Sequence, residues 1–217
     1  MLEYILGNEN ALTMISRVIV LLICFPVHEC AHAWMADRLG DMTGRARGRI
    51  TLNPLKHLDF MGTVFIIVLG FGYAKPVPVN INNFRNKKRD FALTALAGPV
   101  SNLLMAVLFL FIVRLVPGLR SPAGYGALGF YLLVNAAYIN ISLAVFNLLP
   151  IPPLDGSRVL TALLPDGAYD AMLKKERYIM SLLLIAMAAL GRMGYSPIGV
   201  ITSNVFRFLS RIIITGP

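Results

Sequence analysis

Residues 91–113 read FALTALAGPVSNLLMAVLFLFIV and contain no charged side chain, although Asp90 and Arg114 stand at the two ends. An α-helix rises about 1.5 Å per residue, so roughly 20 such residues cross the ~30 Å hydrocarbon layer of a bilayer. A second uncharged run, residues 121–154, is longer still. A soluble domain of 217 residues has no core that would bury both runs. The sequence therefore predicts a protein that spans a membrane.

The composition excludes two other classes of protein. Apolar residues make up 57% of the chain and charged residues 14%, whereas disordered chains have few apolar residues and many charges. The chain has two cysteines, Cys24 and Cys30. Two cysteines are too few for a small secreted domain that depends on a disulfide framework.

Further apolar segments predict more than two spans. Residues 11–36 are a candidate first span, and residues 178–191 and 193–206 are shorter candidates. We expect Pro197 and Gly199 to break the last segment, because proline and glycine interrupt helices. We therefore expect an all-α polytopic membrane protein with five to six transmembrane segments.

Residues 60–74 are apolar but too short to cross the bilayer, and they end in Gly70-Phe71-Gly72. This length is typical of a re-entrant or interfacial piece. We expect it to enter the membrane and return to the same side, between the first and second spanning helices.

The net charge of +9 agrees with a membrane protein rather than a nucleic-acid-binding protein. Ten of the twenty Lys and Arg residues fall between Arg38 and Arg89, beside the short apolar piece, and no separate basic domain is evident. Cytoplasmic loops of membrane proteins carry an excess of Lys and Arg. This rule predicts that residues 38–59 and 75–90 are cytoplasmic and that the first helix runs inward.

The candidate first span contains a polar cluster that reads His28-Glu29-Cys30-Ala31-His32. Residues four apart lie on one face of a helix, so the two imidazoles can bind one Zn²⁺ from the same side. The glutamate beside the first histidine can accept a proton from a water at the metal. Ionisable residues are costly inside a membrane and usually mark function there. The alternative is a self-paired polar cluster that lines a helix bundle.

Catalytic zinc usually has three protein ligands. We interpret Cys24 and Cys30 as small buried apolar residues rather than ligands. The better third ligand is Asp155, the first charged residue after the long uncharged run. Three prolines in residues 150–153 end the preceding helix, and a carboxylate just after that break can turn back toward the metal. The alternative is that Asp155 only caps the segment that follows.

These motifs, with others spread over most of the chain, resemble those of the site-2 proteases, which are intramembrane zinc metalloproteases. The resemblance is to the short forms that lack a PDZ domain. The matching stretches are His28 to His32, Gly48 to His57, Gly72 to Val79, Ala97 to Asn102 and Asn147 to Gly156.

The resemblance implies specific roles for five residues. His28, His32 and Asp155 are the implied ligands of a Zn²⁺ cofactor, and Glu29 is the implied catalytic base. Asn147 is implied to lie near the bound peptide or its oxyanion. The implied partners are the lipid bilayer and a substrate with a transmembrane helix, and we expect no nucleic acid partner.

Residues 72–79 suit the edge of a short re-entrant β element. A transmembrane substrate must be unwound locally before hydrolysis, and an added strand gives its freed backbone groups partners. The prolines favour an extended chain here, and the family is understood to use such an element. The alternative is an ordinary loop at the membrane surface.

Other polar or helix-bending residues carry weaker expectations. We interpret His57 as a turn or interfacial residue, with a regulatory or fourth-ligand role as the alternative. Asn102 is expected to bond a neighbouring helix, and Gly98 to permit close helix packing. Asn135 and Asn140 are expected to do the same as Asn102 or to touch substrate. Pro26 is expected to bend the first helix.

We expect one intramembrane protease domain over residues 1–217, with a catalytic core at about 11–165 and C-terminal helices at about 176–214. The predicted function is zinc-dependent hydrolysis of peptide bonds in or near transmembrane helices of other proteins. We expect the protein in the plasma membrane, with the active site nearer the cytoplasmic side. The alternatives are an ion or proton transporter that uses the same His/Glu/Asp cluster, and an inactive metal-binding homologue that acts as a scaffold.

Overall fold

The structure is a computed structural model, and it describes residues 9–59, 75–120, 124–165 and 175–215. Within these ranges the regular elements are all helical and there is no strand. The longer helices are α2 (Glu9–Ile19), α3 (Phe25–Arg38), α6 (Lys87–Leu115), α7 (Gly124–Asn147), α10 (Glu176–Arg192) and α11 (Pro197–Ser210), and short α4 (Thr43–Ala46) and α8 (Asp155–Val159) lie between them.

The described part of the chain has four helices that are long and apolar enough to cross a membrane, which makes this a membrane protein. They are Met14–Arg38, Lys87–Leu115, Tyr125–Asn147 and Pro197–Ile214. The apolar helix Tyr178–Arg192 is shorter. The all-helical expectation is confirmed for the described residues, and the count of five to six spans stays a prediction. The expected re-entrant piece, residues 60–74, lies outside the described residues.

The first span is one continuous helix with a π-helical turn, Val20–Cys24, in its middle. The Phe25 N–H donates to the Val20 carbonyl, five residues back. The next residue, Pro26, has no N–H to donate and lies at the start of α3. Because proline has no N–H and its ring clashes with the preceding turn, the regular i→i−4 hydrogen bonds of the helix are disturbed just before Pro26. This accounts for the widened turn. The irregularity therefore lies where Pro26 predicts it.

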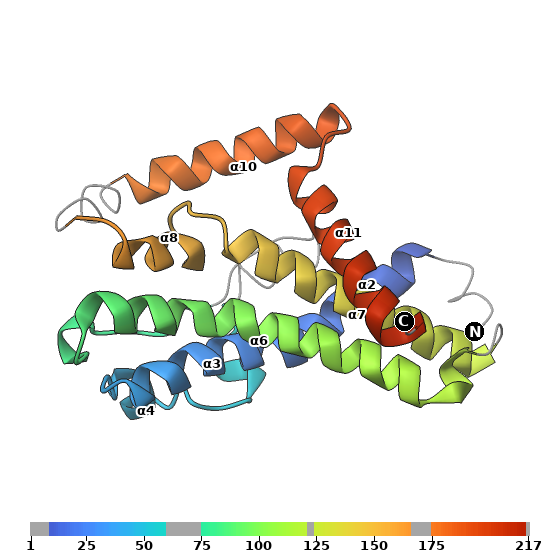
Figure 1. Ribbon diagram of the computed structural model, residues 1–217, viewed down its shortest axis with the longest axis horizontal. Coiled ribbons are helices and arrows are strands. Elements are labelled where there is room, and N and C mark those ends of the chain that lie inside the picture. Colours follow the sequence, from blue (N-terminus) through green and yellow to red (C-terminus); the bar gives the residue numbers. More distant parts are fainter. Residues whose placement is uncertain (1–8, 60–74, 121–123, 166–174, 216–217) are drawn as a thin grey trace.

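Helix α6 is the centre of the bundle. It is the longest helix in Figure 1, with α3 along one side and α7 along another. The buried residues between these helices are mostly apolar: Val20, Cys24, Ala106, Phe109, Leu110, Ala136, Ala137 and Ile141. Small residues such as alanine let the helix backbones approach closely, which is how helices pack in membranes.

The expectation that Pro197 and Gly199 break the last span is wrong. Pro197 is in the first turn of α11, and the Ser196 hydroxyl accepts a hydrogen bond from the Gly199 N–H. Proline is tolerated in the first turn because its missing N–H would have no helical partner there, and serine is a favoured N-cap. These residues begin the helix, which then continues through a π-helical turn at Arg211–Thr215.

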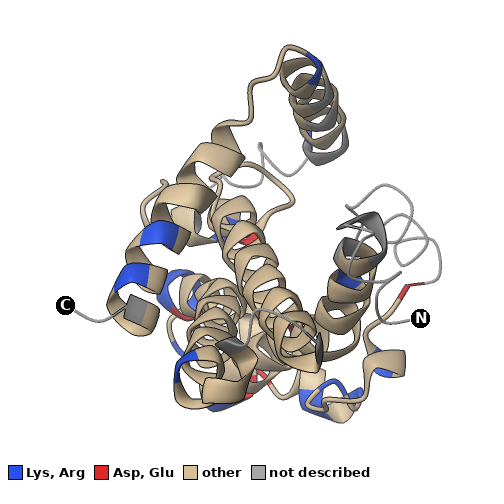
Figure 2. Ribbon diagram, turned by 90° about the vertical axis from the view of Figure 1, so that its right-hand side faces the viewer, with Lys and Arg blue, Asp and Glu red and all other residues tan. Residues whose placement is uncertain are grey.

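Helix α10 stands apart from the other helices in Figures 1 and 2. Its exposed side chains include Tyr178, Leu182 and Ile185. A helix that exposes large apolar side chains in this way fits a lipid environment.

The loop after α3 is tied to residues 80–83 by the buried carboxylate of Asp41. Its oxygens accept hydrogen bonds from the Thr43 N–H and hydroxyl, the Asn80 N–H and the Asn83 side-chain amide. Burial by itself would raise the pKa of Asp41, but these donors outweigh it and hold the pKa below its ordinary value. Asp41 therefore stabilises the fold in its ionised form.

We predict that Asp41→Asn lowers the free energy of unfolding at neutral pH by about 1–3 kcal/mol, because charge-assisted hydrogen bonds are lost. A carboxyl with a lowered pKa stabilises the fold above its unfolded pKa, about 3.9, and that stabilisation disappears as the pH falls through the folded pKa. The difference in the free energy of unfolding between wild type and variant should thus disappear as the pH falls below about 4. Thermal melts in detergent across pH measure it.

Asp37→Asn is the matched control. The Asp37 side chain is 7% exposed, but its carboxylate accepts one hydrogen bond within the described residues, from an Arg45 side chain that is 65% exposed. Asp41 accepts four, so the Asp37 variant should lose less stability. An Asp41→Asn variant no less stable than this control would contradict the proposed anchor.

Candidate metal centre

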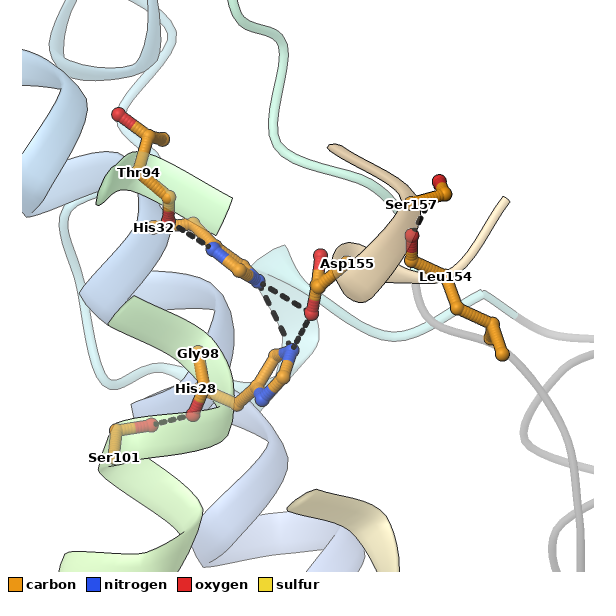
Figure 3. A network of polar contacts seen from close by, with 8 residues as sticks. All are labelled: His28, His32, Thr94, Gly98, Ser101, Leu154, Asp155 and Ser157. Carbon is orange, nitrogen blue, oxygen red and sulfur yellow. Dashed lines mark hydrogen bonds and ion pairs between the residues drawn. The ribbon is translucent and has the colours of Figure 1, made fainter. Parts of the chain in front are cut away.

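Helix α3 places His28 and His32 on one face, one turn apart. Both side chains are buried, and their Nε2 atoms lie 3.0 Å from each other. Figure 3 shows the two rings converging from one helix on the same point. The sequence prediction that these residues share a face is confirmed.

The tautomer of His32 is set by a backbone carbonyl of α6. Its Nδ1 lies 2.8 Å from the Thr94 carbonyl oxygen, which can only accept, so Nδ1 carries the proton and donates. The Nε2 atom of the neutral ring then has a free lone pair, the form that binds a metal.

Asp155 reaches the same point from α8, far along the chain. Helix α7 ends at Asn147, just before the prolines, and residues 148–154 turn back before α8 begins at Asp155. A Cβ on Gly156 would collide with the backbone carbonyls of Leu148 and Leu149. Glycine therefore permits the tight return that delivers the carboxylate.

The capping alternative for Asp155 is not supported. The N-cap of α8 is Leu154, and Asp155 is the first residue of the helix. Its Oδ2 instead lies 3.3 Å from the Nε2 atom of His28 and 3.3 Å from that of His32.

The three donor atoms form a nearly equilateral triangle that fits a divalent cation. Its sides are 3.0, 3.3 and 3.3 Å. Ligands about 2.0–2.1 Å from a tetrahedral metal are about 3.3 Å from one another. The lone pair of His32 and a carboxylate oxygen repel at this distance unless a positive charge lies between them. The residues thus fit a metal with one open coordination position, and they are the cluster in the described residues that could hold one.

Gly98 on α6 lines the centre directly. A Cβ at this position would collide with the rings of both His28 and His32. The sequence predicts close helix packing at Gly98, and the structure shows that the close neighbours are the two candidate ligands.

Glu29 and Asn147 lie on the elements that build the centre. Glu29 is on α3 between the two histidines, with 8% of its surface exposed. Asn147 is the last residue of α7 and is half-buried. Their roles in catalysis stay predictions.

The other candidate ligands lie outside the cluster. Cys24 is buried and accepts a hydrogen bond from the Asn140 amide, which confirms that Asn140 bonds a neighbouring helix. Cys30 is a free, partly buried thiol. His57 is fully buried, and its Nε2 lies 2.8 Å from the Thr51 carbonyl oxygen. His57 is therefore a hydrogen-bonded turn residue, which confirms the prediction of a turn or interfacial residue.

The sequence analysis assigned no role to Arg49, although it is 94% buried. Its guanidinium donates to the carbonyls of Lys56 and Lys75, and the Lys75 N–H donates to the His57 carbonyl. Burial lowers the pKa of Arg49, and the charge of nearby Glu29 partly offsets this. Arg49 thus joins the loop after α3 to the segment that starts at Lys75.

The sequence profile of peptidase family M50 matches residues 16–131 and 123–191, which is more than half of the chain. No solved structure matches.

Three similar proteins each bear the name "Putative zinc metalloprotease". YwhC of Bacillus subtilis is 42% identical over 74% of this chain and 74% of its own length. Rip2 of Mycolicibacterium smegmatis is 32% identical over 79% of this chain and 66% of its own length. MJ0611 of Methanocaldococcus jannaschii is 31% identical over 70% of this chain and 73% of its own length.

The family match and the buried His-His-Asp group lead to one assignment. The chain belongs to peptidase family M50, the site-2 protease family, and is a metalloprotease.

Proposed function

We propose that this protein is an intramembrane zinc endopeptidase, which hydrolyses peptide bonds in or near transmembrane helices of membrane-protein substrates. One observation carries the proposal. His28 and His32 lie in the candidate span Met14–Arg38 and meet the carboxylate of Asp155 at the spacing of tetrahedral zinc ligands. The relatives named as zinc metalloproteases support the choice of metal.

Zinc, when bound, would polarise the scissile carbonyl. It would also lower the pKa of a bound water, which could then lose a proton and attack at neutral pH. The roles of the protein groups follow. Glu29, next to His28 on α3, accepts the proton of the attacking water and passes it to the leaving amine. The Asn147 side-chain amide donates a hydrogen bond to the oxygen that becomes negative. The lone pairs of His28 and His32 and the carboxylate of Asp155 hold the cation.

The position of the centre in a membrane protein indicates how water and substrate reach it and from which side of the membrane. Peptide hydrolysis needs water, so the centre requires a polar path from one side of the membrane. Segments 38–59 and 75–90, which are rich in Lys and Arg, favour the cytoplasmic side. Residues 75–79 supply an edge on which an unwound substrate pairs as a strand. We propose the plasma membrane as the location, and one catalytic domain over the whole chain.

We predict that Glu29→Gln keeps the metal and the fold but abolishes cleavage, because glutamine accepts no proton. The measurement combines zinc content, thermal stability and product formation from single-span reporter proteins in proteoliposomes. Full cleavage by the variant would contradict the base role. Ion flux across the vesicles without peptide products would instead favour a transporter.

We predict that Gly98→Ala weakens zinc binding by roughly tenfold or more, because the added methyl group displaces the two imidazoles and overpacking costs about 1–3 kcal/mol. A competition titration with a chromophoric chelator measures the affinity. Gly191→Ala is the matched control, since a Cβ on that helical glycine of α10 meets nothing within 4 Å. Equal affinities of the two variants would contradict the close approach of α6 to the ligands.

We predict that Arg49→Ala raises KM by about tenfold or more while zinc content stays unchanged. It removes two charge-assisted hydrogen bonds, one of which fixes Lys75 at the start of the proposed substrate edge. Arg47→Ala is the control, because Arg47 is in the same loop but exposed. If both variants keep the wild-type KM, residues 75–79 are not held for the substrate by Arg49.

A further inference from the structure

Three buried polar atoms on α3 and α6 have no hydrogen-bond partner in the described residues. One is the Oδ1 atom of Asp37, whose other carboxylate oxygen pairs with Arg45. The other two are the Nδ1 atom of His28 and the Oδ1 atom of Asn102. Only 1% of the surface of Asn102 is exposed. Buried polar groups are nearly always hydrogen-bonded, so two such atoms on packed helices require an explanation.

His28 needs an acceptor for the nitrogen that faces away from the metal position. Its Nε2 faces Asp155 and His32. Once that nitrogen binds a metal, a neutral ring carries its proton on Nδ1. His32 meets the same need with the Thr94 carbonyl. Ligand imidazoles are normally held by such a second bond, which fixes both the tautomer and the ring orientation.

The periodicity of α6 directs Asn102 toward the side of that helix that faces His28. A Cβ on Gly98 would collide with Cε1 of His28, the ring atom bonded to Nδ1. Asn102 follows Gly98 by four residues, so it lies on the same face of α6 about 6 Å further along. In Figure 3, Nδ1 of His28 lies on the side of the ring away from Asp155 and points in the direction that α6 takes from Gly98 to Ser101.

We propose that Asn102 is the positioning residue of His28, whose Nδ1–H it holds through one buried water molecule that donates to Asn102 Oδ1. This inference rests on the proposed zinc site. The water receives one hydrogen bond and gives another, so both unpartnered atoms are satisfied. The bond keeps the lone pair of Nε2 aimed at the metal position.

Asn140 on α7 offers a comparison with the same chemistry. It is fully buried and its Oδ1 also has no partner in the described residues. However, its amide nitrogen is held by the Ala136 carbonyl and by Cys24, one turn before His28. Gly98 brings α6 against the ring, whereas the amide of Asn140 is bonded to Cys24 and Ala136. We therefore expect Asn140 not to serve His28.

The test is the zinc affinity of the purified protein, measured by chelator competition and so independent of cleavage. Asn102→Leu removes the acceptor at similar size and should weaken binding about 10–100-fold. Asn102→Asp keeps an acceptor oxygen in the same place and should stay close to wild type. Asn140→Leu should bind zinc as wild type does.

Three results would overturn the inference: unchanged affinity in Asn102→Leu, equal losses in Asn102→Leu and Asn140→Leu, or equal losses in Asn102→Leu and Asn102→Asp. If Asn102→Leu does not fold, ¹⁵N-histidine NMR of wild type and Asn102→Asp decides. Between wild type and Asn102→Asp, the Nδ1 resonance of His28 should shift and that of His32 should not. A His28 resonance that does not shift overturns the inference. Wild-type protein that binds no zinc would instead contradict the proposed function.

Discussion

The repulsion among three electron-rich atoms is the constraint on which the rest of the structure depends. The Nε2 atoms of His28 and His32 and the Oδ2 atom of Asp155 lie 3.0–3.3 Å apart in a buried place within the membrane bundle. A proton on one imidazole would offset this repulsion, whereas two neutral imidazoles leave the buried carboxylate uncompensated, which is costly. A cation at their centre turns the repulsion into coordination. The arrangement is therefore one that could hold a metal ion.

Two stripes of residues at four-residue spacing build this centre. On α6, the Thr94 carbonyl holds His32 and Gly98 leaves room for both rings. Asn102 continues the same stripe by one turn. On the first span, His28 and His32 face this stripe. Because both helices repeat every 3.6 residues, one close contact at Gly98 fixes the register of the turns on either side. The geometry of the candidate metal centre is thus a consequence of how two spanning helices pack.

The sequence predicted the parts of this arrangement that depend on residue type. The uncharged run 91–113 predicted α6, the spacing of His28 and His32 predicted a shared face, and the prolines after Asn147 predicted the end of α7. It did not reveal the role of Thr94, because the acceptor is a backbone carbonyl and every residue has one. Nor did it show that Pro197 begins a helix, since a proline in the first turn and a proline that breaks a helix look alike without the structure.

The prolines of the proposed substrate segment distinguish its two edges. In an extended chain, the backbone groups of residues 75, 77 and 79 point to one edge and those of 76, 78 and 80 to the other. Pro76 and Pro78 have no N–H, and the Asn80 N–H is bound by Asp41, so the second edge has no donor left to offer. On the first edge, the Lys75 N–H and carbonyl are already bonded to His57 and Arg49. The donors that this edge offers a substrate are therefore the N–H groups of residues 77 and 79. Strand pairing needs donors as well as acceptors, so under the proposed function a substrate pairs along the edge that begins at Lys75. The prolines on the other edge prevent the segment from pairing on both sides, which keeps it from joining further chains.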